Sequence, residues 1–179
     1  MSLVDLIQPS VSQFHIEKLN QIAQFDYSKV IKQVSKDFNG VLTRTYLNEG
    51  IENLKKYYAV ALLDPFNQHA VSRHVDPFWH AHILHTEEYI AFCETVYQQY
   101  VQHEPLDEEN HIKVAEIAGL YDYTLKVYHQ LFKHVDSNWW PARYAGNDLK
   151  GPTVCKHQEI HSELIRKNAL FPEQSMATH

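Results

Sequence analysis

Apolar residues recur every three or four positions along most of the chain, which is the spacing of one helix face. No stretch alternates apolar and polar residues in the manner of a half-buried strand. The sequence therefore predicts an all-α fold, an irregular or orthogonal bundle of five to seven helices in a single domain over residues 1–179. The helices are expected over residues 12–25, 27–37, 43–63, 76–100, 107–120, 121–135 and 156–168.

Turn and capping residues set the expected boundaries. Ser10 or Ser12 can cap the first helix, Asn39-Gly40 ends the second, and Gly50 is tolerated within the third at a cost of about 1 kcal/mol relative to alanine. The polar segment 65–75 and the segment 146–152 are expected to be loops, and the tail after residue 171 to be loose. Residues 107–135 form two helices or one helix bent near Gly119.

The central helix has the clearest start in the sequence. Asp76 is a good N-cap, and Pro77 follows at the first helical position, where its missing N–H is harmless. The helix is expected to continue to about Tyr100 and to stop before Pro105.

Composition narrows the class of protein. Of 179 residues, 44% are hydrophobic and the net charge is −6, which argues against a protein that coats nucleic acid or an anionic membrane. Two cysteines are too few for a disulfide framework, the N-terminus lacks a secretory signal, and no stretch reaches the roughly 20 apolar residues of a membrane span. We therefore expect a cytoplasmic protein with reduced thiols, without nucleic-acid or membrane partners. A protein partner or a second copy of the chain stays open.

The chain contains 13 histidines, and three of them, His80, His82 and His85, lie in the central helix. Rotation by about 100° per residue places His82 and Tyr89 at the edge of the apolar stripe, whereas His80 faces the opposite flank. His80 and His82 are separated by about 160° on a straight helix, so they cannot serve one metal ion.

Two alternative metal pairs follow from these faces. His82 and His85 are spaced i,i+3, and Asp76 and His80 are spaced i,i+4, so the members of either pair can converge on one ion. Imidazole with carboxylate suits zinc or non-haem iron. In a metal-dependent enzyme, Glu87 or Tyr89 would be the candidate proton-transfer group. The structural alternatives are that Asp76 only caps the helix, that His80 is a solvated ion-pair partner, and that His82 is a satisfied core histidine.

The string W-H-A-H-I-L at 79–84, followed by Tyr89 and Cys93, resembles the signature of the glycine-rich-domain-protein-like family. Asp76 matches the acidic residue that precedes this signature, and residues 103–105 (His-Glu-Pro) resemble the segment that often follows it. The resemblance implies a helical domain with the W-H-x-H helix at its centre, and it implies no reaction. Thr86 and Phe92 depart from the proline and aspartate of many plant members, and the chain has no glycine-rich tail.

Other candidate sites are weaker. His157 and His161 are spaced i,i+4 in the last expected helix and Cys155 could join them, but Glu159 falls on nearly the opposite face from the one a zinc protease needs. His103 follows His80 by 23 residues and is not placed with it. Cys93 is expected to be a buried, inert thiol. Trp139-Trp140 is a docking patch or part of the core, with the core favoured.

These observations give two main hypotheses. The first is a metal-binding helical protein, with enzymatic activity open, whose ligands come from the central helix. The second is a non-catalytic interaction or structural domain whose histidines form a buried polar network. A weaker third hypothesis is a histidine-based pH-responsive module.

Overall fold

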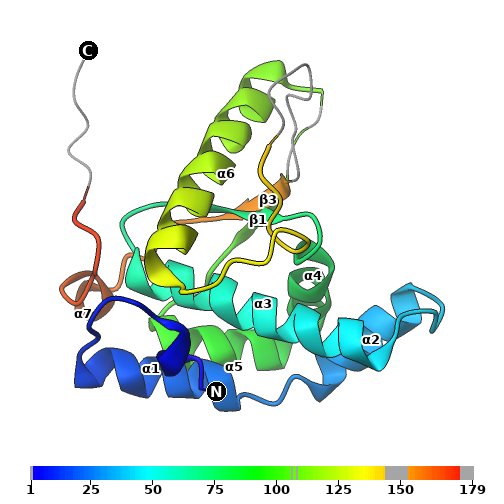
Figure 1. The fold of residues 1–179 in the computed structure, drawn as a ribbon, viewed down its shortest axis with the longest axis horizontal. Helices are drawn as coiled ribbons and strands as arrows, with labels where there is room; N and C mark the ends of the chain where they lie inside the picture. The colour runs from blue at the N-terminus through cyan, green and yellow to red at the C-terminus, as the bar shows by residue number, and fades with distance from the viewer. Residues whose placement is uncertain (1, 106, 108, 144–152, 174–179) are drawn as a thin grey trace.

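The fold is taken from a computed structural model that describes residues 2–105, 107, 109–143 and 153–173. Helices make up most of this part of the chain, so the mostly helical prediction is confirmed (Figure 1). The helices are η1 (Val4–Leu6), α1 (Gln13–Gln24), α2 (Ser28–Asp37), α3 (Arg44–Leu63), α4 (Asp76–Leu84), α5 (Thr86–Tyr97), α6 (His111–Leu131) and α7 (Glu163–Arg166).

A small antiparallel sheet corrects the purely helical expectation. Its strands are β1 (His69–Ser72), β2 (His103–Pro105) and β3 (Thr153–His157), in the order β1-β3-β2. In the central strand β3, His157 pairs with His69 of β1 and with His103 of β2. Cys155 of β3 pairs with Val71 of β1 and with Pro105 of β2. Strands of three to five residues are too short to leave a period of two in the sequence, and their partners are distant along the chain.

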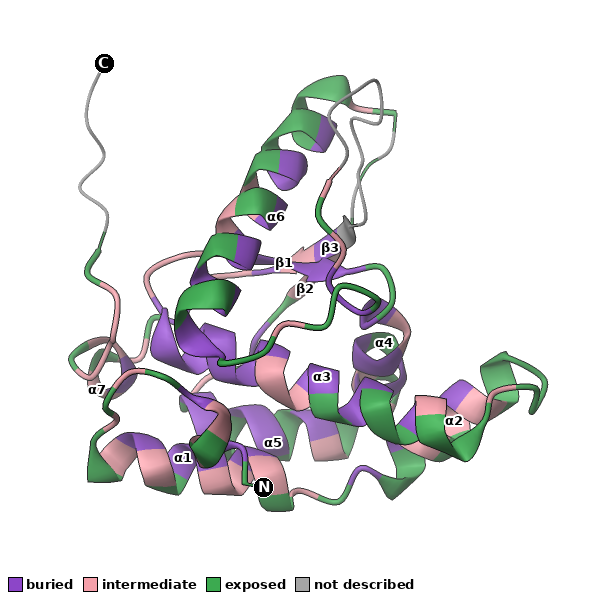
Figure 2. Cartoon of the chain, in the orientation of Figure 1, coloured by how far each residue is buried: buried purple, intermediate pink, exposed green. Residues whose placement is uncertain are grey.

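The helices form two groups around α3. In Figure 1, α3 crosses the middle of the molecule, with α1 and α5 on one side and the sheet and α6 on the other. Figure 2 shows that the C-terminal part of α3 is buried on all its faces, and every residue from Tyr57 to Leu63 is buried. The core therefore surrounds this helix.

Local capping explains where most helices begin. Ser12 Oγ accepts a hydrogen bond from the His15 amide, Thr43 Oγ1 from the Tyr46 amide, and Asn110 Oδ1 from the amides of Ile112 and Lys113. At the end of α2, Gly40 has a φ of +70° and its amide donates to the Ser35 carbonyl oxygen at 2.7 Å. The expected boundaries of α1, α2 and α3 hold to within one residue because their signals are local.

The expected single helix over 76–100 is wrong, because the chain breaks at His85. His85 has φ −90° and ψ 66°, which separates α4 from α5. Gln98 then adopts a left-handed conformation (φ 59°) that ends α5 and turns the chain back toward β2. Val75 is the N-cap of α4, so Asp76 is its first helical residue rather than its cap.

The expected C-terminal helix over 156–168 is also wrong. Residues 153–157 form β3, and α7 spans only four residues. The expected loop at 65–75 contains β1. Of the two alternatives for residues 107–135, two helices or one helix bent near Gly119, the structure has one helix, α6, which continues through Gly119. The expected loop at 146–152 and the tail from residue 174 lie outside the described residues.

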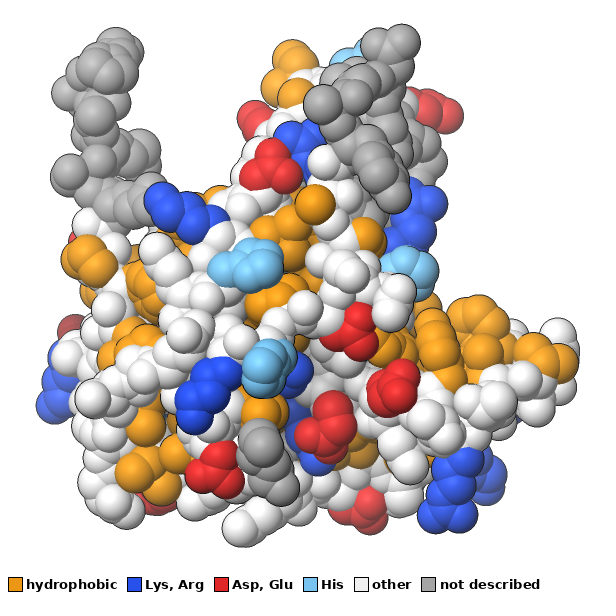
Figure 3. Space-filling model, in the orientation of Figure 1, with side chains coloured by type: hydrophobic (Ala, Val, Ile, Leu, Met, Phe, Trp, Pro, Cys, Tyr) orange, Lys and Arg blue, Asp and Glu red, His pale blue; other side chains and the backbone are white. Residues whose placement is uncertain are grey.

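Trp139 and Trp140 belong to the core. They are 3% and 2% exposed, and Trp140 Nε1 donates to Asn53 Oδ1 at 3.2 Å. A different apolar surface occurs at the end of α2, where Phe38 and Val41 are 42% and 77% exposed. Figure 3 shows hydrophobic side chains gathered at this projecting end of the molecule, with charged side chains of both signs scattered over the rest of the visible face.

Candidate metal centre

The candidate centre begins at the first turn of α4. The Asp76 side chain makes no capping hydrogen bond, and its Oδ2 atom lies 3.3 Å from Nε2 of His80, one helical turn later. The residue is buried, with 7% of its surface exposed, whereas the His80 side chain is 49% exposed. The i,i+4 spacing has therefore placed the two side chains together at the surface edge of α4.

The turn after α5 brings His103 to the same point. His103 Nε2 lies 2.7 Å from His80 Nε2 and 3.5 Å from Asp76 Oδ1. Its ring packs edge-on against Trp79, with the ring centroids 4.7 Å apart. The expectation that His103 stays away from His80 is wrong, because it assumed a straight helix.

Cys155 on β3 completes the cluster. Its Sγ atom lies 3.7 Å from His80 Nε2, and the residue is 3% exposed. One ligand atom each from Asp76, His80, His103 and Cys155 lies within 4.8 Å of the others. This cluster could hold a metal ion.

The separations suit a small divalent ion. A tetrahedral zinc site has bonds of about 2.0–2.3 Å, which put neighbouring donor atoms about 3.3–3.7 Å apart. The contacts of His80 and of His103 with Asp76 are 3.3 and 3.5 Å, each to a different oxygen of the carboxylate, and the contact of Cys155 with His80 is 3.7 Å. The two imidazole nitrogens are closer, at 2.7 Å. A small outward shift of one imidazole ring would bring that contact into the same range.

The Asp76 carboxylate has an electrostatic requirement that a cation would meet. Within the described structure its Oδ1 atom is buried and receives no hydrogen bond. A buried carboxylate oxygen without a hydrogen bond is costly, and a bound cation removes that cost.

His82 lies in a different environment from His80. Its ring is 1% exposed, its Nδ1 atom is hydrogen-bonded to the Tyr58 hydroxyl at 2.7 Å, and burial lowers its pKa to about 4. Rings from α3, α5 and the segment between α1 and α2 surround it: those of Phe25, Tyr27, Tyr58, Tyr89 and Phe92. The side chain is therefore a neutral member of the core.

The remaining members of the sequence-based site lie elsewhere. His85 occupies the break between α4 and α5, and within the described residues no third ligand joins it and His82 around one point. The Tyr89 hydroxyl donates to the Val101 carbonyl oxygen at 2.8 Å and accepts from Trp79 Nε1, so it holds the turn that carries His103. Glu87 is exposed on α5.

A second polar cluster, which the sequence analysis did not single out, lies beneath the sheet. Asp64 Oδ2 lies 3.0 Å from His69 Nε2 and accepts a hydrogen bond from the Tyr123 hydroxyl at 2.7 Å. The His157 ring packs 5.4 Å from that of His69, and burial lowers its pKa to about 3. His157 thus faces the interior while His161 is exposed, and the expected helical pairing of the two is wrong.

Cys93 is the other cysteine of the chain. It is fully buried on α5, and burial raises the pKa of its thiol to about 11. At neutral pH it is protonated, which makes it a poor nucleophile.

Comparison with known proteins gives a family. The UCP032817-like family model matches residues 17–119, more than half of the chain. The chain belongs to the UCP032817-like family. The predicted resemblance to the glycine-rich-domain-protein-like family is wrong, because the family model that matches is the UCP032817-like one. The matched residues include Asp76, His80 and His103, and Cys155 lies beyond them.

Neither the curated proteins nor the solved structures contain a match to the chain. Among the helices of the described residues, none has the length and apolar character that crossing a bilayer requires.

Proposed function

We propose that the protein binds one divalent transition metal ion through Asp76, His80, His103 and Cys155. The convergence of these four donor atoms within 4.8 Å supports the proposal. Local spacing on α4 brings Asp76 and His80 together, and the tertiary structure adds His103 from β2 and Cys155 from β3.

The donor set favours zinc over non-haem iron. A thiolate and two imidazoles are the ligands that zinc takes in most protein sites, and four protein ligands are typical of structural sites. A metal here would join α4 to β2 and β3. Because β2 has only three residues, this cross-link would add substantially to the stability of the sheet.

The second hypothesis, a metal-free structural domain, is favoured by a different observation. His82 Nδ1 is hydrogen-bonded to Tyr58, and His69 Nε2 lies 3.0 Å from Asp64 Oδ2, so both imidazoles make buried contacts with polar side chains of the core. In that case the cluster at Asp76 would be a partly buried group of polar side chains with little affinity for metals.

Metal titration of untagged protein tests the proposal. The protein is treated with a chelator, dialysed and titrated with Zn²⁺ in competition with a chromophoric chelator. We expect one ion per chain with submicromolar affinity. Co²⁺ in place of Zn²⁺ should give the intense visible bands of a tetrahedral site and a thiolate-to-metal charge-transfer band in the near ultraviolet.

Variants locate the site. His103→Ala should weaken zinc binding by at least a hundredfold, and Cys155→Ser should abolish the charge-transfer band. His129→Ala, an exposed histidine on α6, serves as the control and should bind as the wild type does. Failure of the folded wild-type protein to bind zinc, or unchanged binding by His103→Ala, would contradict the proposal.

A further inference from the structure

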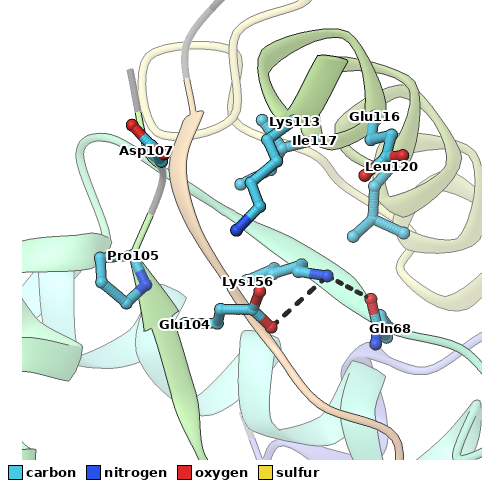
Figure 4. Close-up of a pocket in the computed structure, with 9 residues that line it drawn as sticks. All are labelled: Gln68, Glu104, Pro105, Asp107, Lys113, Glu116, Ile117, Leu120 and Lys156. Atoms are coloured by element: carbon cyan, nitrogen blue, oxygen red, sulfur yellow. Dashed lines mark hydrogen bonds and ion pairs between the residues drawn. The ribbon is translucent and has the colours of Figure 1, made fainter. Parts of the chain in front are cut away.

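A cavity of about 290 Å³ lies between the sheet and α6. Gln68, Glu104 and Lys156 line it from the sheet side, and Lys113, Glu116 and Ile117 line it from α6 (Figure 4). Its volume is at the lower end of the range for ligand pockets, which suits a small molecule.

The cavity is distinct from the metal centre, although the two share strands. Glu104 follows His103 in β2 and pairs in register with Lys156, which follows Cys155 in β3. Successive side chains of a strand point to opposite faces, so the candidate metal ligands lie on one face of the sheet and the cavity wall on the other.

One of the two ammonium groups in the cavity already has partners. Lys156 Nζ donates to Gln68 Oε1 at 2.7 Å and lies 3.5 Å from Glu104 Oε2. Lys113 forms no ion pair within the described residues, and Figure 4 shows its amino group pointing into the cavity. Lys113 is thus available to bind an anionic group.

The same helix offers a carboxylate and an apolar surface. Glu116 lies one turn after Lys113 and forms no ion pair in the described part of the chain. Ile117 and Leu120 continue this lining, and Ile117 is only 4% exposed. Residues three apart on a helix have Cβ atoms about 5–6 Å apart, close enough for both charges to reach one small ligand.

We propose that this cavity binds a small zwitterion with an apolar side chain, an α-amino acid of about the size of leucine. Lys113 binds its carboxylate, Glu116 binds its ammonium group, and Ile117 and Leu120 contact its side chain. The lining carries charges of both signs, since Asp107 and Glu116 are carboxylates and Lys113 is an ammonium group, so a ligand with both charges matches it better than an anion or a cation alone.

Equilibrium dialysis with L-leucine, using 4-methylpentanoate and 3-methylbutylamine as competitors, tests the charge requirement. The first competitor lacks the ammonium group and the second lacks the carboxylate. We expect leucine to bind one per chain and each competitor to bind at least tenfold more weakly. A competitor that binds as well as leucine would overturn the zwitterion assignment, and absence of leucine binding at millimolar concentration would overturn the site.

Variants on α6 locate the ligand. Lys113→Met and Glu116→Gln should each weaken leucine binding at least tenfold, while Lys126→Met, an exposed lysine of α6 outside the cavity, should leave it unchanged. Both cavity residues are exposed, so the variants should fold, which circular dichroism verifies. The zinc stoichiometry of the same samples separates the two proposals, because Lys113 and Glu116 do not contact the metal centre. Leucine affinity unchanged in both cavity variants would contradict this placement of the ligand.

Discussion

His80 and His82 lie two positions apart on α4, and this spacing sends their side chains into different surroundings. His80 is half exposed and meets Asp76, His103 and Cys155, whereas His82 is enclosed by aromatic rings. Burial keeps His82 neutral, since a charged imidazole in that environment would lose its hydration. The Nδ1 atom of His82 is hydrogen-bonded to the Tyr58 hydroxyl, and its buried Nε2 atom has no hydrogen bond within the described residues.

Replacement of His82 therefore separates packing from metal binding. His82→Ala should lower the free energy of unfolding by about 2–4 kcal/mol, because it leaves a cavity among large rings and removes a buried hydrogen bond from Tyr58. Urea denaturation measures this change. The folded variant should still bind one zinc ion, and loss of that ion with little change in stability would instead favour a His82/His85 site.

The position of α4 against α3 is set by one close contact. A Cβ atom built on Gly50 would lie 2.0 Å from Cζ of Phe78, so the absence of a side chain at Gly50 lets the Phe78 ring lie against the α3 backbone. Phe78 is in the same turn of α4 as Asp76 and His80. The glycine that weakens α3 locally thus allows the packing that positions the candidate metal centre.

A pair of glycine substitutions tests this contact. Gly50→Ala should destabilise the protein by about 1–3 kcal/mol through overpacking, although alanine is the better helix former. Gly119→Ala is the matched control, since a Cβ atom there would meet nothing within 4 Å, and it should stabilise the protein by up to about 1 kcal/mol. Thermal denaturation compares the two, and a neutral or stabilising Gly50→Ala would show that Phe78 can move aside.

At the level of the whole molecule, the sheet connects the two proposed sites. β2 and β3 carry His103 and Cys155 on one face and Glu104 and Lys156 on the other. A metal ion that holds these short strands together would also order the wall of the cavity. The two binding events should therefore be coupled, and thermodynamic linkage makes such coupling reciprocal.

Leucine affinity is expected to depend on the metal. Removal of zinc should weaken leucine binding about fivefold or more, and leucine should strengthen zinc binding by the same factor. Isothermal titration calorimetry of the apo and zinc-loaded protein measures both directions. Lys113→Met should abolish the effect of leucine on zinc while leaving zinc binding itself intact, and equal leucine affinities with and without zinc would show that the sites are independent.

The sequence by itself determined the local structure. Periodic apolar positions, the cap at Ser10 or Ser12 and the stop at Asn39-Gly40 predicted α1, α2 and α3 because each signal acts within a few residues of the backbone it orders. The pairing of Asp76 with His80 also came from a local signal, their i,i+4 spacing on one helix. The family came from neither of these signals, and the W-H-x-H motif suggested the wrong one.

Tertiary structure decided which segments that are distant along the chain come into contact. The break at His85 and the turn at Gln98 return His103 to α4, and the pairing of β3 with β2 brings in Cys155 from 75 residues beyond His80. Such contacts form because packing and strand pairing compensate the local preference for a longer helix. Their free energy depends on both partners together, which no single stretch of sequence contains.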